Sequence, residues 1–200
     1  MKRFLLLVVL SFVISFTTTA GATIIPTDLA IDFRTWAGAD GQSSYSIGNV
    51  TATPFPANHT LYQDSTDGLG VKGGEVDEID TLESLQILID GGMNLTGVWI
   101  TDLFDAPDGG NGETGSVNIN NSLIFSFDGN NSDQGNGEIW IGFGSVINIT
   151  EALFTVDNRT NNEYSVAGFT GAPVPEPATM LLLGSGLIGL AGFRKKFKKA

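Results

Sequence analysis

The chain has 200 residues, with 26 glycines, no cysteine and a formal net charge of −12, which suits one globular domain with appended segments. Seven of the ten Lys and Arg residues lie near the two ends, so residues 23–172 carry three basic and 21 acidic residues, a formal charge of −18. Such a body repels phosphate backbones and excludes nucleic acid as a partner, while the lack of cysteine excludes disulfides and thiol catalysis.

The N-terminal segment has the three parts of a secretory signal peptide. Lys2 and Arg3 form a basic start, residues 4–16 form an apolar run, and Ala20 and Ala22 are small residues of the kind that a signal peptidase requires. A permanent membrane anchor is the alternative, but the apolar run is short and a cleavage site follows it. We therefore predict a signal peptide with a signal helix over residues 1–22, cut by signal peptidase after Ala22.

Residues 23–172 are predicted to form one acidic β domain. Their apolar residues alternate with polar ones at the period of half-buried strands. The stretches concerned are 29–33, 45–53, 85–89, 98–100, 123–127, 139–143, 146–149, 153–156 and 164–169. Clusters of Gly, Asn, Asp and Pro predict loops at 68–74, 105–115 and 128–137. This pattern favours an all-β fold, an antiparallel β-sandwich of jelly-roll-like type.

The densest group of acidic residues has the composition of a structural Ca²⁺ site. Carboxylate oxygens around glycine turns are ligands that Ca²⁺ prefers, and six to eight of them are usual. The candidate ligands are Asp67, Glu75, Asp77, Asp80 and Glu83. The alternative is a solvated acidic loop that keeps an exported protein soluble. In either case the spacing of Asp80 and Glu83 is also that of a capping box on one short turn.

The three tryptophans, Trp36, Trp99 and Trp140, allow two interpretations. Exposed indole rings can stack on sugars, whereas in alternating strands such rings more often complete a core. Trp99 and Trp140 each alternate with apolar neighbours, so we expect them on the opposite face of their strands from those neighbours.

No catalytic residue is predicted. The single histidine, His59, lies in a polar stretch and is expected to be exposed, and it offers no Ser-His-Asp arrangement. Carboxylate pairs such as Glu113 with Glu138 could serve a glycosidase, but no spacing places them across a cleft. A secreted glycosidase is therefore only a third hypothesis.

The C-terminal segment has three parts in order. A Pro-Glu-Pro motif is followed by a largely apolar, Gly-rich stretch over residues 178–193 and then by a basic cluster. The residues concerned are Val174, Pro175, Glu176 and Pro177, and then Arg194, Lys195, Lys196, Lys198 and Lys199. As a helix the apolar stretch would be roughly 24 Å long, so flanking basic side chains must help it to cross a bilayer. We predict a single transmembrane helix with its basic end in the cytoplasm.

This arrangement resembles the PEP-CTERM sorting signal of Gram-negative bacteria. The resemblance implies that exosortase, a membrane-embedded cysteine peptidase, recognises and cleaves the segment. It also implies a transient inner-membrane intermediate, followed by the cell surface or the extracellular space. An ordinary C-terminal anchor is the alternative. Residues 60–105 are more loosely similar to the ectodomain of PEP-CTERM proteins of unassigned function, which implies a shared sandwich and no activity.

The expected organisation is a signal peptide (1–22), a β-sandwich ectodomain (23–172) and a sorting tag (173–200). The resemblance implies an exported surface or extracellular-matrix protein, structural or adhesive in exopolysaccharide or biofilm. A calcium-dependent carbohydrate-binding module is the alternative. Exopolysaccharide is the expected partner outside the cell in both cases.

Overall fold

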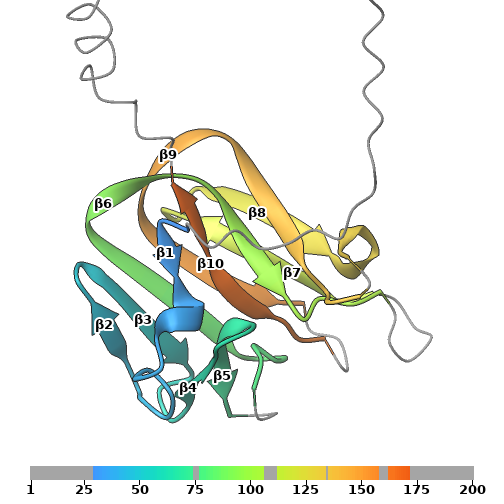
Figure 1. Cartoon of the computed structure of the whole chain (residues 1–200), viewed down its shortest axis with the longest axis horizontal. Coiled ribbons are helices and arrows are strands. Elements are labelled where there is room, and N and C mark those ends of the chain that lie inside the picture. The colour runs from blue at the N-terminus through green and yellow to red at the C-terminus, as the bar shows by residue number, and fades with distance from the viewer. Residues whose placement is uncertain (1–28, 74–76, 106–111, 134, 158–161, 172–200) are drawn as a thin grey trace, which may run out of the picture.

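The computed structural model describes residues 29–73, 77–105, 112–133, 135–157 and 162–171. These residues form strands and two short 3₁₀ helices, which Figure 1 shows in chain order. The elements are β1 (Ile31–Asp32), η1 (Phe33–Thr35), β2 (Tyr45–Ile47), β3 (Val50–Phe55), β4 (Thr60–Asp64), β5 (Gly68–Lys72), β6 (Ser84–Thr101), β7 (Thr114–Ile119), β8 (Leu123–Asp128), η2 (Gly129–Asn131), β9 (Ile139–Val156) and β10 (Ser165–Gly171).

The described strands belong to one sheet in which every pairing is antiparallel. The order along the sheet is β4-β5-β10-β6-β9-β7-β8, while β1 pairs with β10 and the β2–β3 hairpin pairs with β6. The prediction of an all-β fold built from antiparallel strands is confirmed.

The two longest strands, β6 and β9, have 18 residues each and bend near their middles. Gly91, Gly92 and Gly144 have φ angles of 75°, 73° and 73°, in the left-handed region that glycine adopts without steric cost. The register between β6 and β9 shifts beside these glycines. Figure 1 shows both strands arching over the molecule, so the halves of the sheet form two facing layers. The strands predicted separately on either side of the bends are therefore continuous.

Aromatic and aliphatic side chains fill the space between the layers. The ring of Phe154 on β9 lies 5.9 Å from that of Phe169 on β10, and Phe33 of η1 lies 6.0 Å from Phe169. In β6, Leu85 and Ile87 are completely buried whereas Leu88 is exposed, as expected for a strand with one face on the core. Each buried side chain of this size stabilises the fold by about 1.5–3 kcal/mol.

The predicted loop over residues 68–74 is wrong, because residues 68–72 form β5. This strand lies between β4 and β10, and four of its five residues are buried. The absence of a side chain at Gly70 is required here, since an added Cβ would lie 2.0 Å from the Asp77 carbonyl oxygen. The glycines that indicated a loop instead permit close packing of backbone on backbone. Strands β4 and β7 were also not predicted.

Candidate functional site

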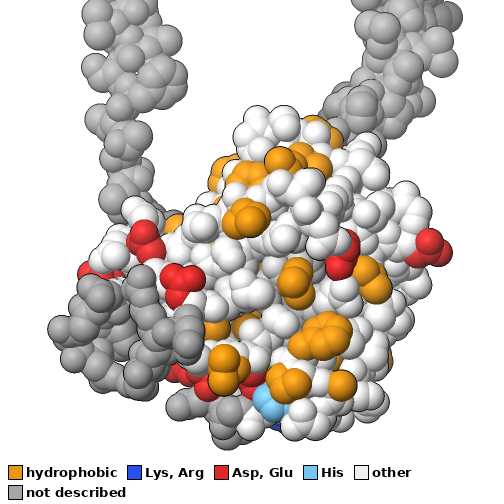
Figure 2. Space-filling model, turned by 180° about the vertical axis from the view of Figure 1, so that it is seen from behind, with side chains coloured by type: hydrophobic (Ala, Val, Ile, Leu, Met, Phe, Trp, Pro, Cys, Tyr) orange, Lys and Arg blue, Asp and Glu red, His pale blue; other side chains and the backbone are white. Residues whose placement is uncertain are grey.

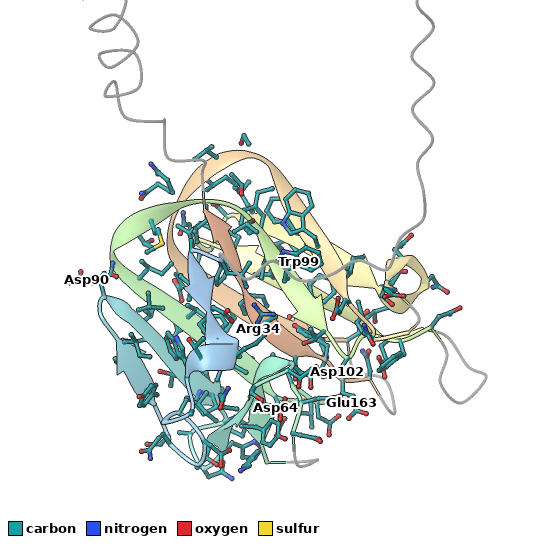
Figure 3. The ribbon with its side chains drawn as sticks, in the orientation of Figure 1. Arg34, Asp64, Asp90, Trp99, Asp102 and Glu163 are labelled. Carbon is teal, nitrogen blue, oxygen red and sulfur yellow. The ribbon has the colours of Figure 1, made fainter. Side chains whose placement is uncertain are left out.

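Carboxylates from five separate parts of the chain gather at one end of the molecule. The register between β6 and β10 pairs Thr101 with Ser165, which brings Asp102 and Glu163 to the same end. The Thr101 hydroxyl donates a 2.8 Å hydrogen bond to the Asp67 carbonyl oxygen, which ties the β4–β5 turn to this end. Figure 3 labels Asp64, Asp102 and Glu163 there. The acidic end is defined by Asp64, Asp67, Asp77, Glu78, Asp102, Glu113 and Glu163.

Burial makes ionisation of three carboxylates at this acidic end unfavourable. Desolvation, reinforced by neighbouring carboxylates, raises the pKa of Glu78 to about 9 and that of Asp102 to about 7. Burial also raises the pKa of Glu113 to about 7, although the Phe104 N–H donates to its carboxylate. The Glu78 Oε2 atom is buried without a hydrogen-bond partner. At neutral pH, protonation of Glu78 therefore relieves both desolvation and repulsion.

Two of the five predicted calcium ligands, Asp67 and Asp77, lie at the acidic end, where burial, and then the nearby Asp64 and Asp77, raise the pKa of Asp67. Asp80 and Glu83 instead form the predicted capping turn. Glu83 Oε2 accepts a 3.1 Å bond from the Asp80 N–H, and Asp80 accepts one from Thr81. Glu75 lies outside the described residues. Among the residues that the structure describes, no three Asp, Glu or His side chains form a group that could hold a metal ion.

The single histidine is not exposed as predicted. The side chain of His59 is 16% exposed, and its Nδ1 lies 2.7 Å from Oε1 of the buried Glu83. Gly73 makes this pair possible, because a Cβ at that position would lie 1.8 Å from His59 Nδ1. A lone histidine and a glycine 14 residues later gave no signal of this contact in the sequence.

Trp140 of β9 forms an exposed aromatic surface. It is 46% exposed, and its indole covers the paired glycines Gly97 and Gly142. A Cβ added at Gly97 would lie 2.5 Å from the indole Nε1, and one at Gly142 would lie 2.7 Å from Cη2. The Nε1 group donates a 3.2 Å hydrogen bond to the Thr170 hydroxyl. The ring is therefore supported by glycine backbone while much of it remains open to solvent.

The other two tryptophans are buried. Trp36 packs edge-on against Phe33, with ring centroids 4.9 Å apart, inside the main core. Trp99 is the cross-strand partner of Trp140 but is only 6% exposed, because it packs with Ala167 and Leu29. The expected core interpretation thus holds for Trp36 and Trp99, and only Trp140 offers an accessible ring.

A hollow of about 470 Å³ lies beside the β7–β8 hairpin. Its lining includes Thr114, Ser116, Phe127, Asp128, Ile139 and Asp157. The Thr114 hydroxyl donates a 2.9 Å hydrogen bond to the Asp157 carboxylate, and the Asn131 side-chain amide donates one of 2.9 Å to the Asp128 carboxylate. Both carboxylates of this lining therefore accept hydrogen bonds from neighbouring lining residues.

The predicted processing signals lie outside the described residues. They are the signal peptide over residues 1–22 with Ala20 and Ala22, the motif residues Val174, Pro175, Glu176 and Pro177, the apolar stretch 178–193, and the basic cluster Arg194, Lys195, Lys196, Lys198 and Lys199. Within the described part of the chain, no helix is long and apolar enough to span a membrane.

Comparison with known proteins identifies the C-terminal segment. Residues 173–196 match the model of the PEP-CTERM protein-sorting motif. No curated protein and no solved structure matches the chain. The matched segment contains Pro175, Glu176 and Pro177 and the first part of the basic cluster, so the resemblance seen in the sequence is confirmed. The chain therefore carries a PEP-CTERM protein-sorting motif, which indicates an exported protein processed by exosortase.

Proposed function

We propose that this exported protein has a structural or adhesive role at the cell surface or in the extracellular matrix, where it contacts exopolysaccharide. In this proposal signal peptidase removes residues 1–22, and exosortase acts on the sorting motif while the chain is held in the inner membrane. The observation that supports a polysaccharide partner is the exposed ring of Trp140.

The Trp140 ring has properties suited to a sugar. Its position over Gly97 and Gly142 and its bond to Thr170 hold the indole in one orientation, so little conformational entropy is lost on binding. An indole offers a broad apolar face that can cover the C–H face of a pyranose ring. The Thr170 hydroxyl lies beside its Nε1 edge, and Thr96 Oγ1 lies 3.1 Å from Thr170 Oγ1. Apolar area beside hydroxyl groups matches the mixed surface of a sugar.

Charge narrows the type of polysaccharide. With 21 acidic residues among residues 23–172, the body repels polyanions. Figure 2 shows hydrophobic side chains exposed on the rear of the molecule, with acidic groups at its margins and almost no Lys or Arg in view. We therefore propose that the preferred polymer is neutral.

Replacing Trp140 with alanine should weaken binding to neutral exopolysaccharide about tenfold, because the stacking surface is lost. Trp140→Phe should retain most of the affinity. Leu82, which is 83% exposed in the turn before β6, supplies a matched control, and Leu82→Ala should bind like the parent chain. Co-sedimentation of each purified protein with exopolysaccharide from the native host measures the affinities. Equal binding by the Trp140→Ala and parent proteins would exclude this surface.

We also propose a binding role in preference to hydrolysis. Of the carboxylates considered for a glycosidase, Glu113 is 4% exposed and accepts a hydrogen bond from the Phe104 N–H. A general acid in such a position has little access to a polymer. Release of reducing ends from the bound exopolysaccharide, lost on Glu113→Gln, would contradict this part of the proposal.

A calcium-dependent mode of binding is the second candidate. The described carboxylates of the acidic end do not form a ready metal-binding group, so in this candidate the ion itself draws them together. The buried Glu78 Oε2 lacks a hydrogen-bond partner, and Asp67 and Asp77 lie at the same end. A divalent cation would need these groups ionised, and it would then offset their repulsion.

Calcium should therefore raise the melting temperature more at pH 8 than at pH 5. An ion at 100 times its dissociation constant adds about 2.7 kcal/mol to the free energy of unfolding. Thermal unfolding in millimolar calcium, in millimolar magnesium and in chelator provides the comparison. An unchanged midpoint in calcium at pH 8 would exclude a folded-state site, and it would leave the role of Trp140 intact.

A further inference from the structure

Strand β8 is an open edge of the sheet. It is the last strand in the sheet order and pairs only with β7 among the residues that the structure describes. Leu123 is 43% exposed and Ile124 is 67% exposed, and Ser126 is also exposed. An edge strand with free backbone groups and apolar side chains is a template for another strand.

The opposite end of the sheet is protected, which makes the exposure of β8 distinctive. At β4, the Leu61 N–H donates to the Gln42 carbonyl at 2.7 Å, and the Gly41 N–H donates to the Leu61 carbonyl at 2.8 Å. The β2–β3 hairpin pairs with β6 outside the main strand order, and its outer strand β2 has only three residues. Strand β8 has six residues without Lys, Arg, Pro or Gly, so it lacks the residues that usually prevent edge pairing.

The hydrogen bonds between β7 and β8 show which backbone N–H and C=O groups of β8 could pair with a further strand. The Gly129 N–H donates a 2.8 Å bond to the Glu113 carbonyl in the strand register that pairs Thr114 with Asp128. Because hydrogen-bonding direction alternates along an antiparallel strand, the polar backbone groups of Leu123, Phe125 and Phe127 face β7. Those of Ile124 and Ser126 consequently face outward from the sheet.

We propose that β8 pairs antiparallel with β8 of a second copy of this chain, in a register centred on Phe125. In that register Ile124 of one copy is opposite Ser126 of the other, so the outward backbone groups of the two strands meet. Leu123 lies opposite Phe127 on the face that carries the core, where Phe125 already packs 5.0 Å from Phe143. The sheets of the two copies become one continuous sheet across a two-fold axis.

Charge favours this edge over the other faces of the body, and it favours this register. The body is strongly acidic, so most faces of two copies repel each other, but β8 has a single charge, Asp128, at its end. Antiparallel pairing centred on Phe125 separates the two Asp128 residues by roughly 20 Å along the strands. At that distance, which exceeds the Debye length of physiological salt, their repulsion is largely screened. This dimer is independent of sugar binding, because Trp140 lies on β9.

The absence of cysteine allows a direct test in the full-length chain, kept in mild detergent. An Ile124→Cys protein mixed with a Ser126→Cys protein places thiols on directly opposite residues, about 5.5 Å apart between Cα atoms, within disulfide range. Mild oxidation should then give mixed disulfide dimers in several-fold higher yield than either protein alone. Leu82→Cys, on an exposed turn, is the matched control for random collision. A mixed yield no higher than that of Leu82→Cys would overturn the proposal.

The second measurement uses a charge introduced on the edge strand β8. Ile124→Lys should shift the chain from dimer to monomer in sedimentation-velocity ultracentrifugation, since a lysine on an edge strand opposes pairing. Leu82→Lys adds the same charge elsewhere and should leave the dimer population unchanged. Circular dichroism checks that both variants are folded. If Ile124→Lys and the parent chain have the same dimer population, β8 pairing is excluded.

Discussion

Glu78→Gln should stabilise the domain at pH 8 and have little effect at pH 4. The pKa of Glu78 is raised from 4.5 to about 9, so the folded state retains a proton that the unfolded chain releases above pH 4.5. Below pH 4.5 this group does not lower the free energy of unfolding. As the pH rises from 4.5 toward 9, the free energy of unfolding falls progressively. Glutamine cannot ionise and removes this loss. We expect a gain of about 2–4 kcal/mol at pH 8, since each pKa unit corresponds to 1.36 kcal/mol.

Urea unfolding of the parent and variant at pH 4, 6 and 8 measures this effect. Asp90→Asn is the matched control, because Asp90 is exposed and lies far from the acidic end in Figure 3. The control should follow the pH dependence of the parent chain. If the free energy of unfolding of Glu78→Gln falls between pH 6 and pH 8 as much as that of the parent, Glu78 is ionised without penalty in the folded protein.

Gly70→Ala should cost about 2–4 kcal/mol of folding stability. The added methyl group would lie 2.0 Å from the Asp77 carbonyl oxygen and 2.8 Å from Glu78 Cα, so backbone must move rather than a flexible side chain. The strain falls between β5 and residues 77 and 78, which belong to the acidic end. The variant should unfold at a clearly lower urea concentration with a similar slope.

Gly135→Ala provides the control for loss of a glycine. A Cβ there would have only ordinary contacts, the nearest being 3.5 Å from an Asp133 carboxylate oxygen. Its stability should stay within about 0.5 kcal/mol of the parent value. Equal midpoints for Gly70→Ala and the parent would mean that β5 does not pack against residues 77 and 78 in solution.

The sequence predicts the strands whose alternation is visible locally and fails where packing overrides local preference. Stretches 85–89 and 123–127 alternate clearly, and both are strands in the structure. Strand β5 was missed because Gly68 and Gly70 resemble turn residues, although their lack of a side chain is what admits neighbouring backbone. Likewise the stretches 139–143 and 146–149 were predicted as separate strands, but Gly144 between them provides a bend inside one continuous strand.

Long-range register explains why the acidic end could not be predicted. Asp102, Glu113 and Glu163 are far apart in the sequence and meet only because β6, β7 and β10 pair as they do. Asp80 and Glu83, which are close to Asp77 in sequence, belong instead to a capping turn. The sorting motif is the opposite case, since its three parts are contiguous and can be recognised without knowledge of the fold.

The pairing of β1 with β10 has a mechanical consequence. These first and last strands are antiparallel, with Ile31 opposite Phe169, so the described body begins and ends at neighbouring points. A chain tethered through its C-terminal segment would therefore hang from a place where its N-terminal strand is also attached. Tension applied there runs along β10, whose ladder to β6 extends from Ser165 to Gly171. These hydrogen bonds share a shearing load, whereas bonds pulled from one end of a hairpin fail one after another.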